Sequence, residues 1–287
     1  FDISDSNRIQ YGAPIVGQLN PASSTNAYRI EVAAGDKLAI QASAVSQASW
    51  ARLRWVDPLG RVVWQTNSVQ SMPSSSHLLA GTYTLFVEGG INRTGVFDYN
   101  LSINLEENVP PAPLTGTPLT LGESIQGQLT EIGQVVSYRF DTAEPKVVYF
   151  DALSNPPNSL RWTLRDAGGA LIDLRPFIFS DSSHQAQPSV WIPAGKYQLQ
   201  ISASGTFTGS YQFRMLDLAQ GTVVSVGNPF SAELTPPSST NVYRLSVAAG
   251  QQLYFHVPAS SNRAGAIMRL IDDFGRVAFS TSSLNDG

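Results

Sequence analysis

Apolar and polar residues alternate with a period of two along much of this chain. Between Tyr28 and Val32, the residues Tyr28, Ile30 and Val32 fall on one face, whereas Arg29 and Glu31 fall on the other. The same alternation recurs in five further segments: Leu53–Val56, Tyr138–Phe140, Trp162–Leu164, Tyr243–Val247 and Met268–Leu270. This period is typical of β-strands that bury one face against a core.

Turn signals separate these segments at regular intervals. Three of them begin with aspartate and end with glycine: Asp57–Gly60, Asp166–Gly169 and Asp272–Gly275. Aspartate caps backbone N–H groups and glycine adopts the left-handed conformation, so we expect each to close a hairpin. No stretch shows apolar residues at helical spacing. Roughly eight short strands per hundred residues predict an all-β chain built of antiparallel, jelly-roll-like β-sandwiches.

The pattern occurs three times. Tyr28-Arg29, Tyr138-Arg139 and Tyr243-Arg244 recur at spacings of 110 and 105 residues, each preceded by a short motif such as Gly17-Gln18-Leu19. A period of this size fits a small domain rather than a solenoid turn. We predict tandem sandwiches at residues 1–108, 109–219 and 220–287. The proline-rich stretch from Glu106 to Pro118 is expected to be a stiff linker.

The third sandwich is expected to be incomplete, because the counterpart of residues 73–108 is missing from it. Two core strands would be lost, which leaves open edges. We therefore expect the sequence to be a piece of a longer repetitive protein. Completion by a strand from another subunit, as in a fibre, is the alternative.

Composition narrows the possible partners. Charged residues are 14% of the chain, the net charge is −4, and lysine occurs three times, at Lys37, Lys146 and Lys196. Without a basic tract, binding to nucleic acid or to anionic membranes is not expected. No apolar run reaches the roughly 18 residues that a membrane span needs. There are no cysteines, which excludes disulfides and thiolate metal sites.

Taken in order, the motifs resemble one known family. The Tyr-Arg strand is followed by Asp57–Gly60, then by Ala80-Gly81-Thr82-Tyr83, and finally by Thr94-Gly95, and a similar series begins at Tyr138. This series resembles the bacterial pre-peptidase C-terminal domain. The resemblance implies a small β-sandwich of secreted bacterial proteins with no catalysis of its own. It covers the first two repeats and the front of the third.

Catalytic motifs are absent from the sequence. The histidines are His77, His184 and His256, and the first two follow Ser-Ser in serine-rich stretches. A Ser-His hydrolase needs groups that converge from different parts of the fold, which neighbours in one loop do not do. We predict solvated loops there, no enzymatic activity and no cofactor.

Calcium is the one metal that the turns suggest. Asp57, Asp166 and Asp272 recur, and calcium prefers oxygen ligands. A calcium site needs several convergent oxygens, however, and most of these turns offer one carboxylate. Turn capping is therefore the preferred interpretation, with calcium left as an alternative.

Five residues are candidates for ligand contact. Trp50 and Trp64 are the better surface candidates among the tryptophans and would suit a glycan, because Trp55 and Trp162 lie on the predicted inward face. Arg29, Arg139 and Arg244 recur on the outward face and would form an anion-binding stripe. The preferred interpretation, however, is that they pair with strand carboxylates such as Glu31.

These patterns favour an extracellular or cell-surface protein. We predict a non-enzymatic, tandem-repeat segment of an adhesin-like or filament-forming bacterial protein that acts as spacer and contact module. Its partners would be neighbouring repeats or copies of the same protein, and glycans are a further option. The alternative is a carbohydrate-binding accessory module of a secreted hydrolase or protease.

Overall fold

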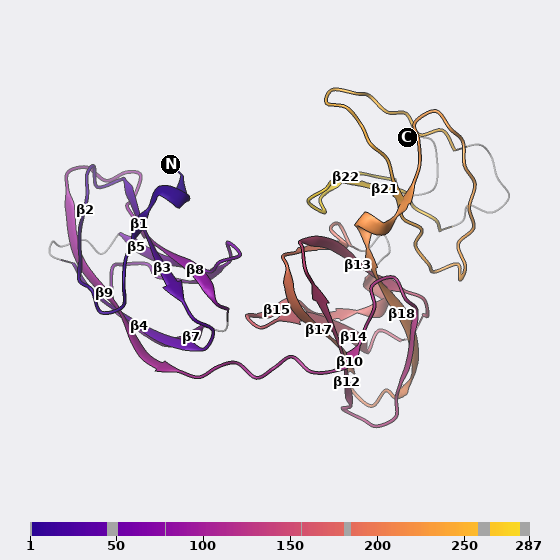
Figure 1. Ribbon diagram of the computed structural model, residues 1–287, viewed down its shortest axis with the longest axis horizontal. Helices are drawn as coiled ribbons and strands as arrows, with labels where there is room; N and C mark the ends of the chain where they lie inside the picture. The colour runs from indigo at the N-terminus through magenta and orange to yellow at the C-terminus, as the bar shows by residue number, and fades with distance from the viewer. Residues whose placement is uncertain are drawn as a thin grey trace. The chain divides into compact units, whose positions relative to one another are not determined.

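The computed structural model describes residues 2–44, 51–77, 79–155, 157–180, 185–257 and 265–281 (Figure 1). The chain separates into two compact units, one centred on residues 1–113 and the other on residues 114–287. Both consist of short strands in mainly antiparallel sheets, which confirms the all-β sandwich prediction. Among the described residues, no helix is long and apolar enough to cross a membrane.

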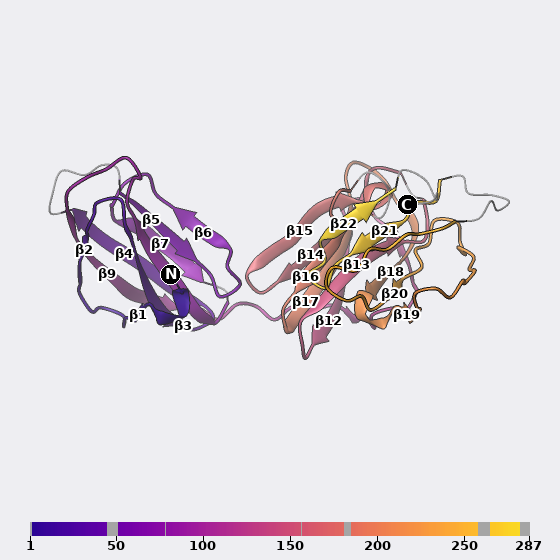
Figure 2. The same ribbon diagram turned by 90° about the horizontal axis from the view of Figure 1, so that it is seen from above.

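The first unit is a β-sandwich, here called the first sandwich, whose two sheets pack on one core (Figure 2). One sheet has five strands, in the order β1 (Asn7–Arg8), β3 (Thr25–Val32), β8 (Gly81–Glu88), β5 (Arg52–Val56) and β6 (Val62–Gln65). The other has four strands, in the order β2 (Ile15–Leu19), β9 (Phe97–Asn108), β4 (Asp36–Ala44) and β7 (Met72–His77). A short 3-10 helix, η1 (Ile3–Asp5), precedes β1.

The second unit contains a sandwich with the same order of strands, here called the second sandwich. Its five-stranded sheet runs β10 (Thr117–Pro118), β12 (Val135–Thr142), β17 (Gly195–Ala203), β14 (Leu160–Asp166) and β15 (Gly169–Pro176). Its four-stranded sheet runs β11 (Ile125–Leu129), β18 (Gly209–Asp217), β13 (Lys146–Ala152) and β16 (Ser189–Ile192). The helices η2 (Phe177–Phe179) and η3 (Leu218–Gln220) follow β15 and β18.

The inward positions predicted from the alternation form the two cores. Trp55 is 0% exposed and Trp162 is 1% exposed, each at the centre of its own cluster of apolar side chains. The indole N–H of Trp162 donates to Ser180 Oγ at 2.6 Å, so the buried ring carries no unsatisfied polar group. The prediction that these two tryptophans lie in the core is confirmed.

Residues 220–287, the third segment, hold little regular structure. Their strands are β19 (Thr222–Val223), β20 (Tyr243–Arg244), β21 (Arg269–Ile271) and β22 (Val277–Ser280). The predicted strand from Tyr243 to Val247 ends at Arg244, and Val247 is 54% exposed. A strand gains little from alternation without a partner sheet to cover its apolar face, and none of the segment's described residues belongs to either core cluster. The division into three sandwiches stays a prediction.

Two smaller expectations are also corrected. The serine-rich stretch that ends at His77 was expected to be a loop but forms β7, because its backbone pairs with β4. The turn after Asp166 is shorter than its counterparts, since β14 ends at Asp166 and β15 begins at Gly169. The predicted linker lies between the end of β9 at Asn108 and the start of β10 at Thr117.

Candidate functional site

The tryptophan candidates do not form a surface platform in the described residues. Trp64 lies on β6, is half-buried, and stacks on the core residue Trp55 with ring centroids 6.2 Å apart and planes at 12°. The core therefore uses one face of Trp64. Trp50 lies outside the described residues.

The Tyr-Arg motif lies beside a short strand in all three places where it occurs. A two-residue strand runs parallel to the motif in each case. Asn7 pairs with Tyr28, Thr117 with Tyr138 and Thr222 with Tyr243, and each following residue pairs with the arginine. We call this arrangement the linker clasp. The corresponding residues pair with each other in all three places.

Side chains reinforce the linker clasp on the incoming chain. In the third segment, Arg244 Nη1 donates to the carbonyl of Ala219 at 2.9 Å. In the second sandwich, Gln198 Nε2 donates to the carbonyl of Thr115 at 2.6 Å. Gln198 stands directly across the sheet from Arg139. These donors hold the residues just ahead of the parallel strand.

The three arginines of the Tyr-Arg motifs differ in exposure. Arg29 is half-buried, whereas Arg139 and Arg244 are exposed, and Arg244 is engaged with the incoming chain. Pairing of Arg29 with Glu31 is not found. The Glu31 carboxylate instead accepts from Thr82 Oγ1 at 2.7 Å and lies 3.9 Å from Arg8.

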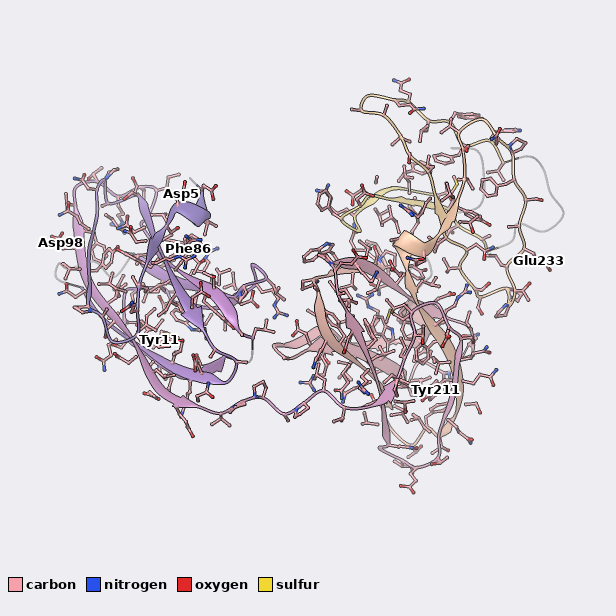
Figure 3. The ribbon with its side chains drawn as sticks, viewed as in Figure 1. Asp5, Tyr11, Phe86, Asp98, Tyr211 and Glu233 are labelled. Carbon is pink, nitrogen blue, oxygen red and sulfur yellow. The ribbon has the colours of Figure 1, made fainter. Side chains whose placement is uncertain are left out.

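A buried pair of tyrosines links the two sheets of each sandwich. The hydroxyls of Tyr28 and Tyr99 are 2.7 Å apart, and those of Tyr138 and Tyr211 are 2.9 Å apart (Figure 3 labels Tyr211). Burial raises the pKa of Tyr99 and of Tyr211 far above the usual value, and the hydrogen bond to the partner tyrosine adds to this. Both therefore stay neutral and serve as hydrogen-bonding groups rather than as acids.

The aspartate turns close on themselves. Asp57 Oδ1 accepts the backbone N–H groups of Leu59 and Arg61, at 2.9 and 2.8 Å, and Oδ2 accepts Arg61 Nε at 2.6 Å. Asp272 repeats these contacts with Phe274 and Arg276, at 3.0, 2.9 and 2.7 Å. Both carboxylates are thus engaged inside their own turns. The described residues contain no group of three or more possible metal ligands.

A buried ion pair joins the third segment to the second sandwich. Asp151 lies on β13 between two core residues, so its side chain points to the outer face of the sheet, where it is 0% exposed. Asp151 Oδ2 accepts Arg214 Nε at 2.6 Å and the backbone N–H of Thr240 at 3.3 Å. Arg214 Nη2 donates to the carbonyl of Thr240 at 2.8 Å. Burial raises the pKa of the Asp151 carboxyl, and Arg214 opposes this.

A second contact holds the aspartate turn of the third segment on the same sheet. Ser189 Oγ, on β16, donates to the carbonyl of Gly275 at 2.6 Å. The backbone N–H of Val277 donates to Gln187 Oε1 at 3.1 Å. We call the outer surface around Asp151, Arg214 and Ser189 the junction face. It contacts two separate parts of the third segment.

The sequence did not single out the junction face. Asp151 and Arg214 are 63 residues apart and lie opposite each other only because β13 pairs with β18. An aspartate within an apolar strand, between Phe150 and Ala152, was the one available signal. It is unusual because a buried carboxylate requires a partner.

Two of the three histidines lie within the described residues. His77 lies on β7, and His256 is exposed and stacks on Tyr254 with ring centroids 6.5 Å apart. His184 lies outside the described residues. The predicted solvated loop at His77 is replaced by a strand, as described above.

No protein-family model matches the sequence, and no curated protein matches it. Among solved structures, the chain is similar to the pre-peptidase C-terminal domain of a collagenase from Bacillus anthracis. The two are 20% identical over 36% of this chain and 97% of that one, with a TM-score of 0.28. It is also similar to the CUB1-EGF-CUB2 segment of human MASP-1/3, with 7% identity over 70% and 99% of the two chains and a TM-score of 0.21. A protein of Eubacterium rectale described as secreted shows 12% identity over 71% and 74%, with a TM-score of 0.22. Membership of the pre-peptidase C-terminal family stays a prediction.

Proposed function

We propose that the chain is a non-enzymatic, extracellular segment of a bacterial surface protein, in which β-sandwich repeats act as spacers and contact modules. The proposal is supported by the recurring polar residues, because their side chains make hydrogen bonds within the fold itself. The aspartates close turns, the tyrosines join sheets, and Arg244 holds the incoming chain. Side chains that hold the fold together through these hydrogen bonds are not free to act on a substrate.

The junction face supports the contact role. A buried, charge-assisted pair costs desolvation, so it gives specificity rather than large net stability. Asp151 and Arg214 bond a particular backbone segment, at Thr240, in a defined orientation. Repeats fixed to one another in this way suit an adhesin-like or filament-forming protein. No cofactor is needed for any of these contacts.

The surface location is tested on intact cells of the natural source. An antibody raised against the purified chain should label unpermeabilised cells, and protease added outside should remove the label. Labelling that requires permeabilisation would contradict the proposal. A cytoplasmic protein in the same cells, labelled only after permeabilisation, is the control.

The spacer role is tested by pulling the chain from its two ends in a force spectrometer. A spacer should resist load through its sandwiches, and each should unfold as one event. Release of about 100 residues lengthens the chain by about 350 Å, at roughly 3.5 Å per residue. Gradual extension without such steps would argue against a load-bearing role.

The runner-up, a carbohydrate-binding accessory module, is favoured by one observation. Trp191 is 46% exposed on an edge strand.

A further inference from the structure

An exposed tryptophan stands at the edge of the second sandwich. Of the four tryptophans within the described residues, Trp191 has the most accessible ring: it is 46% exposed, whereas Trp64 is half-buried and the other two are core residues. Trp191 lies on β16, the edge strand of its sheet, directly opposite Val147 on β13. An exposed aromatic at an unpaired sheet edge is a common feature of binding surfaces.

A second exposed aromatic belongs to the turn of the third segment that docks on the same sheet face. Trp191 shares a sheet face with Ser189, two residues earlier, and Ser189 Oγ binds the carbonyl of Gly275 at 2.6 Å. Phe274, the residue before Gly275, is 67% exposed. The docked turn therefore brings the backbone next to Phe274 onto the sheet face that carries Trp191.

The Arg276 side chain lies against the ring of Phe274. The Arg276 guanidinium carbon lies 5.1 Å from the centroid of the Phe274 ring, and Asp272 holds that guanidinium through a 2.7 Å bond to Nε. Arg276 is 72% exposed, so its remaining N–H groups face solvent. Asp273 is exposed beside it. The surface thus alternates between aromatic faces and hydrogen-bonding groups.

We propose that Trp191 and Phe274 form a platform for a neutral, β-linked polysaccharide chain. Pyranose rings with equatorial substituents present flat C–H faces, which pack against the electron-rich faces of aromatic rings. Their hydroxyls point sideways, where Arg276 and Asp273 can bond them. An extended, ribbon-like chain of such sugars contacts separated rings in succession.

Two features favour a neutral sugar over other partners. The Asp272 carboxylate is paired with Arg276, which leaves the exposed Asp273 carboxylate in this turn to repel an anionic glycan. A protein partner would require a contiguous apolar centre, whereas the turn that carries Phe274 is made largely of polar residues. The site is independent of the spacer role, since it requires only that the turn of the third segment sits on the junction face.

The experiment is affinity electrophoresis of the full chain in native gels cast with soluble hydroxyethyl cellulose or glycol chitin. At least one polymer should retard the wild-type protein. Trp191→Ala and Phe274→Ala should each weaken the binding constant at least about tenfold, and Trp191→Tyr should retain part of it. Ser189→Ala should weaken binding without touching either ring, because it loosens the turn. Circular dichroism and thermal unfolding establish that each variant is folded.

Tyr254→Ala is the matched control, because Tyr254 is an aromatic residue of the third segment that is 72% exposed outside the platform. It should leave the retardation unchanged. The proposal is overturned if neither polymer retards the wild type, if Trp191→Ala binds as well as the wild type, or if Tyr254→Ala loses as much binding as Trp191→Ala. None of these results bears on the surface labelling or the force measurement.

Discussion

One glycine in each sandwich lies against a tyrosine ring. Gly17 stands directly opposite Tyr99, and the Cβ atom of any larger residue there would clash with the ring; Gly127 and Tyr211 show the same geometry. The ring needs this space to cross the strand and reach its tyrosine partner on the other sheet. Glycine is thus required here for close approach rather than for a turn.

Gly127→Ala should therefore destabilise the second sandwich. Relief of the clash must move the Tyr211 ring, which strains or breaks the hydrogen bond to Tyr138. Such overpacking costs typically about 1–3 kcal/mol. Chemical denaturation followed by fluorescence measures the loss in the free energy of unfolding.

Gly195→Ala is the matched control in the same sandwich. Its added Cβ would meet its nearest neighbour, Tyr197, at 3.5 Å, an ordinary contact. It should change stability by less than about 1 kcal/mol, because alanine also restricts the unfolded chain. Equal losses in the two variants would show that the tyrosine pair does not set the requirement.

The sequence shows that a glycine recurs at this position, but it does not show why glycine is required there. Gly17-Gln18-Leu19 and Gly127-Gln128-Leu129 are visibly alike, yet the tyrosines they accommodate lie more than 80 residues further along the chain. Alternation identifies which face a tyrosine occupies. It does not identify which distant residue its hydroxyl reaches, because that depends on how the two sheets stack.

At the scale of elements, local signals predicted the turns well and the third segment's strands poorly. The Asp57 and Asp272 turns have the same hydrogen bonds, since each involves only five consecutive residues. A strand depends on its neighbours. β3 is flanked by β1 and β8, whereas β20 pairs with β19 alone among the described strands, and it is two residues long.

Removal of divalent ions should leave the protein unchanged. The carboxylates of Asp57 and Asp272 are already satisfied by their turns, so calcium would have to break those bonds. We expect EDTA to shift the thermal unfolding midpoint by less than about 1 °C. Calcium at a hundred times its dissociation constant would add about 2.7 kcal/mol. A rise of several degrees with added calcium would therefore revive the calcium interpretation.

The Asp151–Arg214 pair gives a pH-dependent prediction. Arg214→Ala leaves a buried carboxylate without its partner, which costs about 3–5 kcal/mol when the carboxylate is charged. Burial raises the folded pKa of Asp151 above its unfolded value of 3.8. The stability linked to its protonation is then fully present below pH 3.8 and is lost as the pH rises through the raised pKa. The variant should therefore lose much more stability at pH 7 than near pH 3.5, each measured against wild type at the same pH.

The double variant Asp151→Asn/Arg214→Ala isolates the cause. It has no carboxylate to protonate, so its loss of stability relative to wild type should vary less between the two pH values than that of Arg214→Ala. If the single and double variants show the same pH dependence, some other carboxylate is responsible. Hydrogen exchange at Thr222 and Arg244 would report whether the third segment loosens first.

For the whole molecule, the distribution of buried apolar side chains decides what can fold alone. The first sandwich has its own core, which contains Trp55, Phe97 and Leu85 at 0% exposure. The third segment contributes no described residue to either core cluster and is held by bonds to the junction face. Composition and alternation could not show this difference, because the third segment is as apolar in pattern as the others.

Fragments should reflect that difference. A fragment of residues 1–113 should unfold cooperatively, because small domains with one core are usually two-state. A fragment of residues 220–287 should show no cooperative transition, because its local turns are worth too little to offset the chain entropy of folding. A fragment of residues 114–287 should protect the amides of Thr222 and Arg244 from exchange more strongly than residues 220–287 alone. Equal protection in the two fragments would mean that the third segment is stable without the junction face, and the role given to Asp151 and Ser189 would have to be abandoned.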